Sequence, residues 1–137
     1  PRTMLSLGDG GAHCGYICDA SLPTFMLTHW TRDRSRGEKL PIELIVKRQT
    51  SSTAAIYGLH DRGLIKPGYI ADFNLIDYDN LTLHAPHFIA DLPAGGRRIV
   101  QEADGYLATI KAGQTIFEHG KPTGTLPGKL IRGPQAV

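Results

Sequence analysis

A single carboxylate at the end of an apolar run is the first group in this sequence that could do chemistry. Residues 5–16 read LSLGDGGAHCGY, and Asp9 follows Leu5 and Leu7 directly before two glycines. An isolated charge is expensive to bury, so a carboxylate at the tip of an apolar strand indicates a functional role. The simpler interpretation is a turn, because Asp followed by Gly-Gly is a common turn sequence.

The neighbours of Asp9 are suited to binding a substrate. His13 lies four residues further on, and an imidazole can bind a substrate carboxylate or exchange a proton near neutral pH. Gly8, Gly10 and Gly11 would let the backbone turn sharply and approach a ligand closely. Gly10, Gly11 and His13 are therefore candidate substrate-binding residues, although a loop histidine without a role fits the same pattern.

The cysteines and the remaining histidines offer weaker metal-binding patterns. Cys14 and Cys18 lie beside His13, but no second ligand pair follows at the spacing of a zinc site, and two cysteines make no disulfide framework. We interpret them as reduced thiols packed in or near a core. The pair of His84 and His87 has no further ligand nearby and is interpreted as exposed loop.

Composition limits the class of protein. The chain has 137 residues, is 41% hydrophobic and carries a net charge of +2 from 15 basic and 13 acidic residues, which indicates one globular core. The basic residues form no stripe, so a nucleic-acid partner is not expected. No apolar run approaches the roughly 20 residues of a membrane helix, and no leader opens the sequence, so we expect no membrane partner and a cytoplasmic location.

The first half of the chain has helical periodicity. An apolar stripe that includes His29 predicts a helix over 21–32, with that histidine in the core. Pro41 is expected to open a second helix. Residues 50–58 predict a third, with Ser51 or Ser52 as its N-cap.

The second half has strand and turn signals. A Pro-Gly turn at 67–68 precedes a β-rich run over 71–76. A hairpin is predicted around the turn at 112–113, with a further turn at Gly120. Residues 79–96 contain several prolines and glycines and little periodicity, and they are interpreted as loop.

The apolar run that contains Leu5 and Leu7 resembles a buried parallel strand, which needs neighbours on both sides. The chain offers no such neighbours. We therefore expect it to be the last part of a longer polypeptide. The stretch from Thr123 to the end is expected to be an extended tail that packs on another part of the protein.

Several segments carry a resemblance to the amidohydrolase superfamily. DRGLIKPGYIADFNLID at 61–77 resembles the phrase that opens the terminal β-sandwich of these enzymes, and TSSTAAIYGL at 50–59 resembles the helix before it. GDGGAH at 8–13 and GQTIFEHGKPTGTLPGKLIRG at 113–133 resemble the N-acyl-D-amino-acid deacylases, also called D-aminoacylases.

The resemblance implies an α/β fold. Residues 1–62 would be the end of a (β/α)8 barrel, comprising strand eight and the following helices, and residues 63–137 a small β-sandwich with its tail. Asp9 would end strand eight and point into the active site, which barrels form at this end of their strands. It would act as general base and acid, and it is a candidate metal ligand. The family more often has serine where Gly8 stands. Asp72, in the YIAD phrase, is interpreted as structural.

The implied activity is metal-dependent hydrolysis of the amide bond of N-acyl-D-amino acids. The full-length enzyme would use zinc or another divalent metal, but the family's ligand histidines have no counterpart in this chain. We therefore expect the chain alone to bind no catalytic metal and to be inactive. Its expected partners are the substrate, the missing N-terminal barrel segment and a second copy of itself. The alternatives are a hydantoinase- or dihydroorotase-like hydrolase and a non-catalytic β-rich binding or scaffold module.

Overall fold

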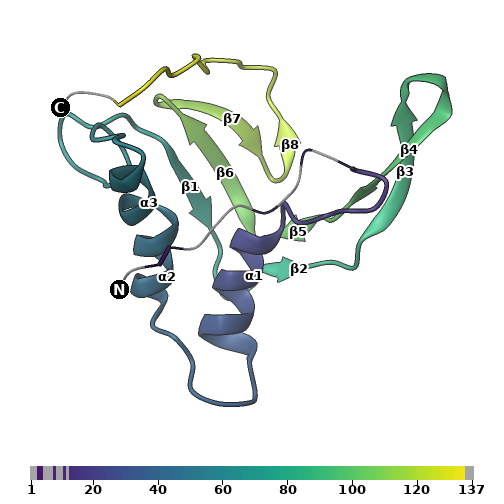
Figure 1. Ribbon diagram of the computed structural model, residues 1–137, viewed down its shortest axis with the longest axis horizontal. Helices are drawn as coiled ribbons and strands as arrows, with labels where there is room; N and C mark the ends of the chain where they lie inside the picture. Colours follow the sequence, from purple (N-terminus) through teal and green to yellow (C-terminus); the bar gives the residue numbers. More distant parts are fainter. Residues whose placement is uncertain (1–2, 5–7, 9–10, 12, 135–137) are drawn as a thin grey trace.

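The computed structural model describes residues 3–4, 8, 11 and 13–134. The fold is mixed α/β, and in the described part of the chain the α-helices precede the antiparallel strands (Figure 1). The long helical segments are α1 at Leu22–Thr28, a π-helical turn η1 at His29–Asp33, α2 at Ile42–Gln49 and α3 at Ser51–Ile56. In this described part, no helix is long and apolar enough to cross a membrane. The predicted barrel strand at Leu5–Gly8 lies outside the described residues except for Gly8.

The helix predicted over 21–32 forms, but it changes character at His29. Helix α1 has Pro23 in its first turn, where a missing N–H costs nothing, and ends at Thr28. The hydroxyls of Thr28 and Thr31 then donate back to the carbonyls of Thr24 and Leu27. Such back-bonding loosens the helical ladder, and the chain continues as the π-helical turn η1.

The environment of His29 is that of an aromatic cluster. Its ring stacks on Phe25 with centroids 4.8 Å apart and meets the edge of Trp30 at 5.4 Å. The side chain is half-buried. The prediction of a packed histidine on the apolar stripe is therefore right in its contacts, although the residue is less buried than a core position.

The second and third helices begin close to their predicted positions. Helix α2 starts directly after Pro41, as predicted. The predicted N-cap of α3 is wrong, because Ser51 is already the first helical residue and Thr50 takes the cap position. Only that one residue separates the two helices, and its hydroxyl donates to the carbonyl of Val46 at 2.7 Å. It therefore serves the end of α2 and caps nothing in α3.

The main sheet has four antiparallel strands in the order β1-β6-β7-β8. These are β1 at Phe73–Ile76, β6 at Tyr106–Lys111, β7 at Gln114–Glu118 and β8 at Lys121–Pro122. The two turns predicted for the hairpins of this sheet are confirmed. Ala112 and Gly113 have φ of 50° and 76°, and His119 and Gly120 have 46° and 75°. Two consecutive left-handed residues make the tight hairpin turn that matches the twist of its strands.

The prediction of a loop over 79–96 is wrong. This region contains β2 at Thr82–Leu83, β3 at His87–Leu92 and a 3-10 turn η2 at Pro93–Gly95. They are followed by β4 at Gly96–Val100 and β5 at Ala103–Asp104. Strand β3 pairs with β4, and β2 pairs with β5.

The β3–β4 hairpin extends to one side of the main sheet (Figure 1). Neither face of this hairpin is buried. Its sequence therefore lacks the alternation of apolar and polar residues that identifies a strand with one buried face. Cross-strand contacts stabilise it instead. The Arg98 guanidinium pairs with the Asp91 carboxylate through two bonds of 2.8 and 2.7 Å, and the Arg97 guanidinium lies 5.7 Å from the centre of the Phe88 ring.

A small core joins the helices to the strands. Leu27 of α1, Ile45 of α2 and Leu81, from the loop before β2, are buried, with Leu81 completely inaccessible to solvent. Arg32 of η1 secures that loop. Its guanidinium donates to the carbonyl oxygens of Leu81 at 2.7 Å and Asp79 at 3.2 Å, and also to that of Tyr78.

Asp72 has the structural role that the sequence predicts. Its carboxylate accepts a bond from the Ala112 N–H at 2.8 Å and pairs with the Lys111 ammonium at 2.9 Å, while Arg62 lies 3.7 Å away. Burial alone would raise the pKa of Asp72, but these bonds and nearby cations outweigh it and hold the pKa below its ordinary value. The carboxylate thus connects the start of β1 to the β6–β7 turn.

We predict that Asp72→Asn lowers the free energy of unfolding by about 1–3 kcal/mol, because a half-buried charge pair and a backbone acceptor are lost. Because the pKa of Asp72 is lower in the folded state, its contribution to stability is complete above the pKa of the unfolded state, about 3.9. That contribution is lost as pH falls through the pKa of the folded state. Urea unfolding at neutral and acidic pH measures both effects. The variant should show a weaker loss of stability in acid than the wild type.

The matched control is Asp104→Asn, because Asp104 is 74% exposed and pairs only with His84 in the described structure. A surface pair of this kind contributes little. Equal effects of the two substitutions would contradict the structural role of Asp72.

Many large apolar side chains remain exposed on the described part of the chain. Ile65 is 96% exposed, Leu126 93% and Leu130 77%. We predict that the isolated 137-residue chain self-associates, because so many exposed large apolar side chains favour association. Sedimentation velocity over a range of concentrations tests this, and a monomer at every concentration would contradict it.

Candidate functional site

The loop that carries the predicted catalytic residue is closed at its base. Asp9 and Gly10 lie outside the described residues, but Gly8 before them packs directly on the backbone of Asp19. A Cβ atom at Gly8 would overlap the Asp19 carbonyl oxygen and lie 2.9 Å from the carbonyl carbon. Glycine is therefore required at position 8 for the two ends of this loop to meet. The close approach gives a physical reason for glycine where the family more often has serine.

The two other predicted binding residues that the structure describes are exposed. A Cβ atom at Gly11 would meet nothing within 4 Å, so the described surroundings do not require glycine there. His13 has a left-handed backbone with φ of 51°, and its carbonyl accepts bonds from the N–H groups of Tyr16 and Ile17 at 2.7 and 3.0 Å. These bonds close a single turn within the loop. A substrate-binding role for Gly11 and His13 stays a prediction.

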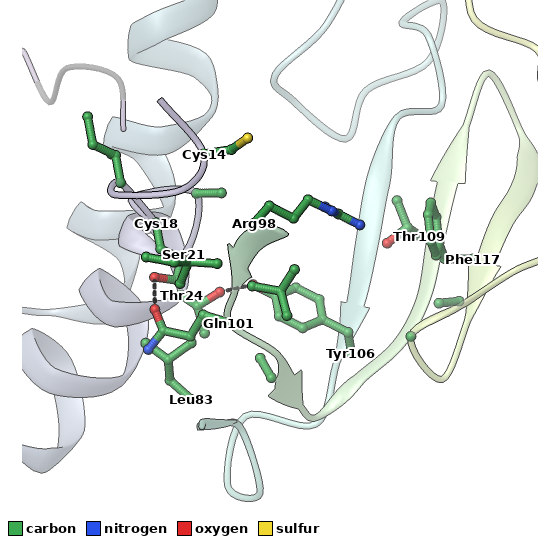
Figure 2. A pocket seen from close by; sticks show the side chains of 17 residues that line it. Cys14, Cys18, Ser21, Thr24, Leu83, Arg98, Gln101, Tyr106, Thr109 and Phe117 are labelled. Atoms are coloured by element: carbon green, nitrogen blue, oxygen red, sulfur yellow. Dashed lines mark hydrogen bonds between the residues drawn. The ribbon is translucent and has the colours of Figure 1, made fainter. Parts of the chain in front are cut away.

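A cavity of about 430 Å³ opens beside this turn (Figure 2). One wall is the segment from Cys14 to Thr24, and the opposite walls come from β2 and β4–β7. Both cysteines line it as free, half-buried thiols, as the sequence predicts. Strand β4 is tied to the first wall by a bond of 2.8 Å from the Ile99 N–H to the Cys14 carbonyl.

Two side-chain bonds hold the walls of the cavity together. The Ser21 hydroxyl donates to the Gln101 side chain at 2.5 Å, and the hydroxyls of Thr24 and Tyr106 are 2.8 Å apart. These partners are about 80 positions apart in the sequence. The sequence therefore contains no local pattern that could have identified Gln101, Tyr106 or the cavity.

Arg98 is the one charged side chain among the described residues that line this cavity. Its bonds to Asp91 hold the pKa of that carboxyl below the ordinary value and raise the pKa of the guanidinium. Both groups are therefore charged throughout the physiological range. The sequence did not identify Arg98, because its partner Asp91 lies in the region predicted as loop over 79–96.

The described residues do not form a metal centre. No group of three or more His, Cys, Asp and Glu side chains could hold an ion among the residues that the structure describes. The Nε2 atom of His84 lies 2.8 Å from a carboxylate oxygen of Asp104, in an exposed pair. A catalytic zinc site needs at least three protein ligands, so the described part of the chain does not fit one.

Comparison with protein-family models identifies the class of protein. The amidohydrolase family model matches residues 3–117, which is most of the chain. The protein belongs to the amidohydrolase family and is thus related to hydrolases. Comparison with curated proteins and with solved structures gives no match.

We predict that Gly8→Ala lowers the free energy of unfolding by about 1–3 kcal/mol, because the added methyl group forces the Asp19 backbone away. Gly11→Ala is the matched control, since its methyl group enters open space and should change stability by less than about 0.5 kcal/mol. Urea unfolding measures both variants. Equal stabilities would show that the loop is not closed at Gly8.

Proposed function

We propose that this chain is the C-terminal part of a metal-dependent hydrolase that cleaves the amide bond of N-acyl-D-amino acids. Membership of the amidohydrolase family supports the hydrolase class. The phrases at 8–13 and 113–133 support the D-aminoacylase branch, because they resemble it at both ends of the chain. In this proposal residues 1–62 complete a barrel and residues 63–137 contribute a small β-sandwich.

The observation that carries the proposal is the place of Asp9 in the sequence, directly after the Gly8 that packs on Asp19. Asp9 follows an apolar run and Gly8 in the sequence. The contact between Gly8 and Asp19 brings the two ends of the loop together. A carboxylate at the end of a barrel strand lies where such enzymes have their active sites. We propose that the structure around Gly8 serves to present this carboxylate.

Asp9 would act first as a general base and then as a general acid. It takes a proton from the water that attacks the amide carbonyl carbon, and it donates that proton to the amine nitrogen as the carbon–nitrogen bond breaks. The products are a carboxylate and a D-amino acid. Gly10, Gly11 and His13, which follow in the same loop, would contact the substrate.

Zinc or another divalent ion would supply a Lewis acid in the full-length enzyme. The described residues contain no set of three ligands, so the remaining ligands would come from the rest of the polypeptide. Asp9 is itself a candidate ligand.

We predict that Asp9→Asn in the full-length protein lowers kcat for N-acetyl-D-amino acids by roughly 10²–10⁴-fold, which is the usual contribution of a general acid–base group. The change removes the basic oxygen and preserves the size of the side chain. Steady-state kinetics of amine release measure it. Asp79→Asn, at an exposed position after β1, is the control and should keep wild-type kcat.

A wild-type kcat for Asp9→Asn would contradict the assigned role. Substrate profiling tests the branch. Ring opening of hydantoin or dihydroorotate without release of D-amino acids would replace the proposal with the cyclic-amide alternative. Absence of hydrolysis with every substrate would favour a non-catalytic module.

A further inference from the structure

We infer that the cavity beside Arg98 binds an organic carboxylate that carries an apolar group. The inference rests on the proposed function to the extent that an N-acyl amino acid, which has both features, would be the natural occupant. A volume of about 430 Å³ is within the range of small-molecule sites.

Most of the cavity lining is apolar. Ile17, Leu83, Ile99, Val100 and Phe117 contribute aliphatic and aromatic surface from four different parts of the chain. Such a lining favours an acyl chain or an apolar amino-acid side chain, because burying that surface releases water from both.

Four neutral polar side chains of the cavity are already bonded to each other in pairs. The Ser21 hydroxyl donates to Gln101, and the hydroxyls of Thr24 and Tyr106 share a bond. They give the walls rigidity and need no ligand. The charged group that remains for recognition is the Arg98 guanidinium.

Arg98 keeps free donors for a ligand. A guanidinium has five N–H groups, and Asp91 takes one from Nε and one from Nη2. The two N–H groups of Nη1 and the second of Nη2 are left. The side chain is 40% exposed and extends into the cavity, so a carboxylate can reach these donors (Figure 2).

The charge balance favours a single carboxylate over a multiply charged anion. No other cationic side chain lines the cavity among the described residues, and Asp91 already neutralises part of the field of Arg98. A doubly charged phosphate would lack a second cation. A carboxylate matches the planar donors of one guanidinium.

The position of the cavity connects it to the proposed active site. Cys14 and Cys18 line it, and they belong to the loop that Gly8 and Asp19 close. Ile99, the residue after Arg98, donates its N–H to the carbonyl of Cys14 in that loop. Arg98 is therefore next in sequence to a residue that contacts the loop. A ligand anchored at Arg98 would thus lie beside the segment that follows Asp9.

Binding of hexanoate and of its neutral analogue hexanamide to the full-length protein tests the inference by isothermal titration calorimetry. We expect hexanoate to bind the wild type. Replacing hexanoate with hexanamide, or Arg98 with Gln, should lower the binding affinity by about tenfold or more, since a charged hydrogen bond of roughly 1.5–3 kcal/mol is lost. Arg97→Gln is the matched control, because Arg97 is on the same strand, packs on Phe88 and does not line the cavity. It should bind as the wild type does.

The Asp91→Asn variant tests whether a loss of hexanoate binding in Arg98→Gln is caused by misfolding. It breaks the same ion pair as Arg98→Gln but leaves the guanidinium free, so it should bind hexanoate at least as tightly as the wild type. Weak binding by both variants, or equal binding of hexanoate to wild type and Arg98→Gln, would overturn the inference. So would the absence of hexanoate binding to the wild type.

The outcome for this site is separable from the outcome for the proposed function. Deacylation of N-acyl-D-amino acids with an unchanged KM in Arg98→Gln would overturn the inference about Arg98 and leave the deacylase proposal in place. Binding of hexanoate through Arg98 in a protein that hydrolyses no N-acyl-D-amino acid would support the inference about Arg98 and overturn the deacylase proposal.

Discussion

The junction between helices and strands depends on Arg32. Its guanidinium donates to three carbonyl oxygens of the loop at 78–81, those of Tyr78, Asp79 and Leu81. The loop is thereby held so that Leu81 is completely buried against Leu27 and Ile45. Because few large apolar residues of the described chain are buried, this contact determines how the helical layer and the strands meet.

The cavity is a consequence of that junction. Once α1 lies against the β strands, Thr24 reaches Tyr106 and Ser21 reaches Gln101, and these bonds hold two walls of the open cavity. The loop before α1 then forms one wall of the cavity. The same loop is closed where Gly8 packs on the backbone of Asp19. Core packing, the cavity and the closure of this loop are thus parts of one arrangement.

The features that could be predicted from the sequence are those that local chemistry determines. Proline at position 41 starts α2, and the Ala112-Gly113 turn allows the left-handed backbone that a tight hairpin needs. Asp72 was predicted to be structural because it stands next to a turn, and its bonds to Lys111 and the Ala112 N–H agree.

The features that escaped prediction depend on partners far away in the chain. The β3–β4 hairpin has no buried face, so its strands lack the alternation that marks a strand. Its stability comes from pairing and from the Arg98–Asp91 bridge. The bond from Ser21 to Gln101 joins residues 80 positions apart, and no local pattern encodes it. The cavity therefore became visible only in the folded chain.

The central claim is that these residues complete a metal-dependent hydrolase whose ligands lie elsewhere in the polypeptide. Sequencing the source transcript upstream of the codon for Pro1 tests it most directly. The account predicts an open reading frame that continues for roughly the 250 residues of a barrel or more, with a His-x-His pair near its start and further histidines between. An initiator methionine immediately before Pro1 would contradict it, because no barrel or metal centre could then be built.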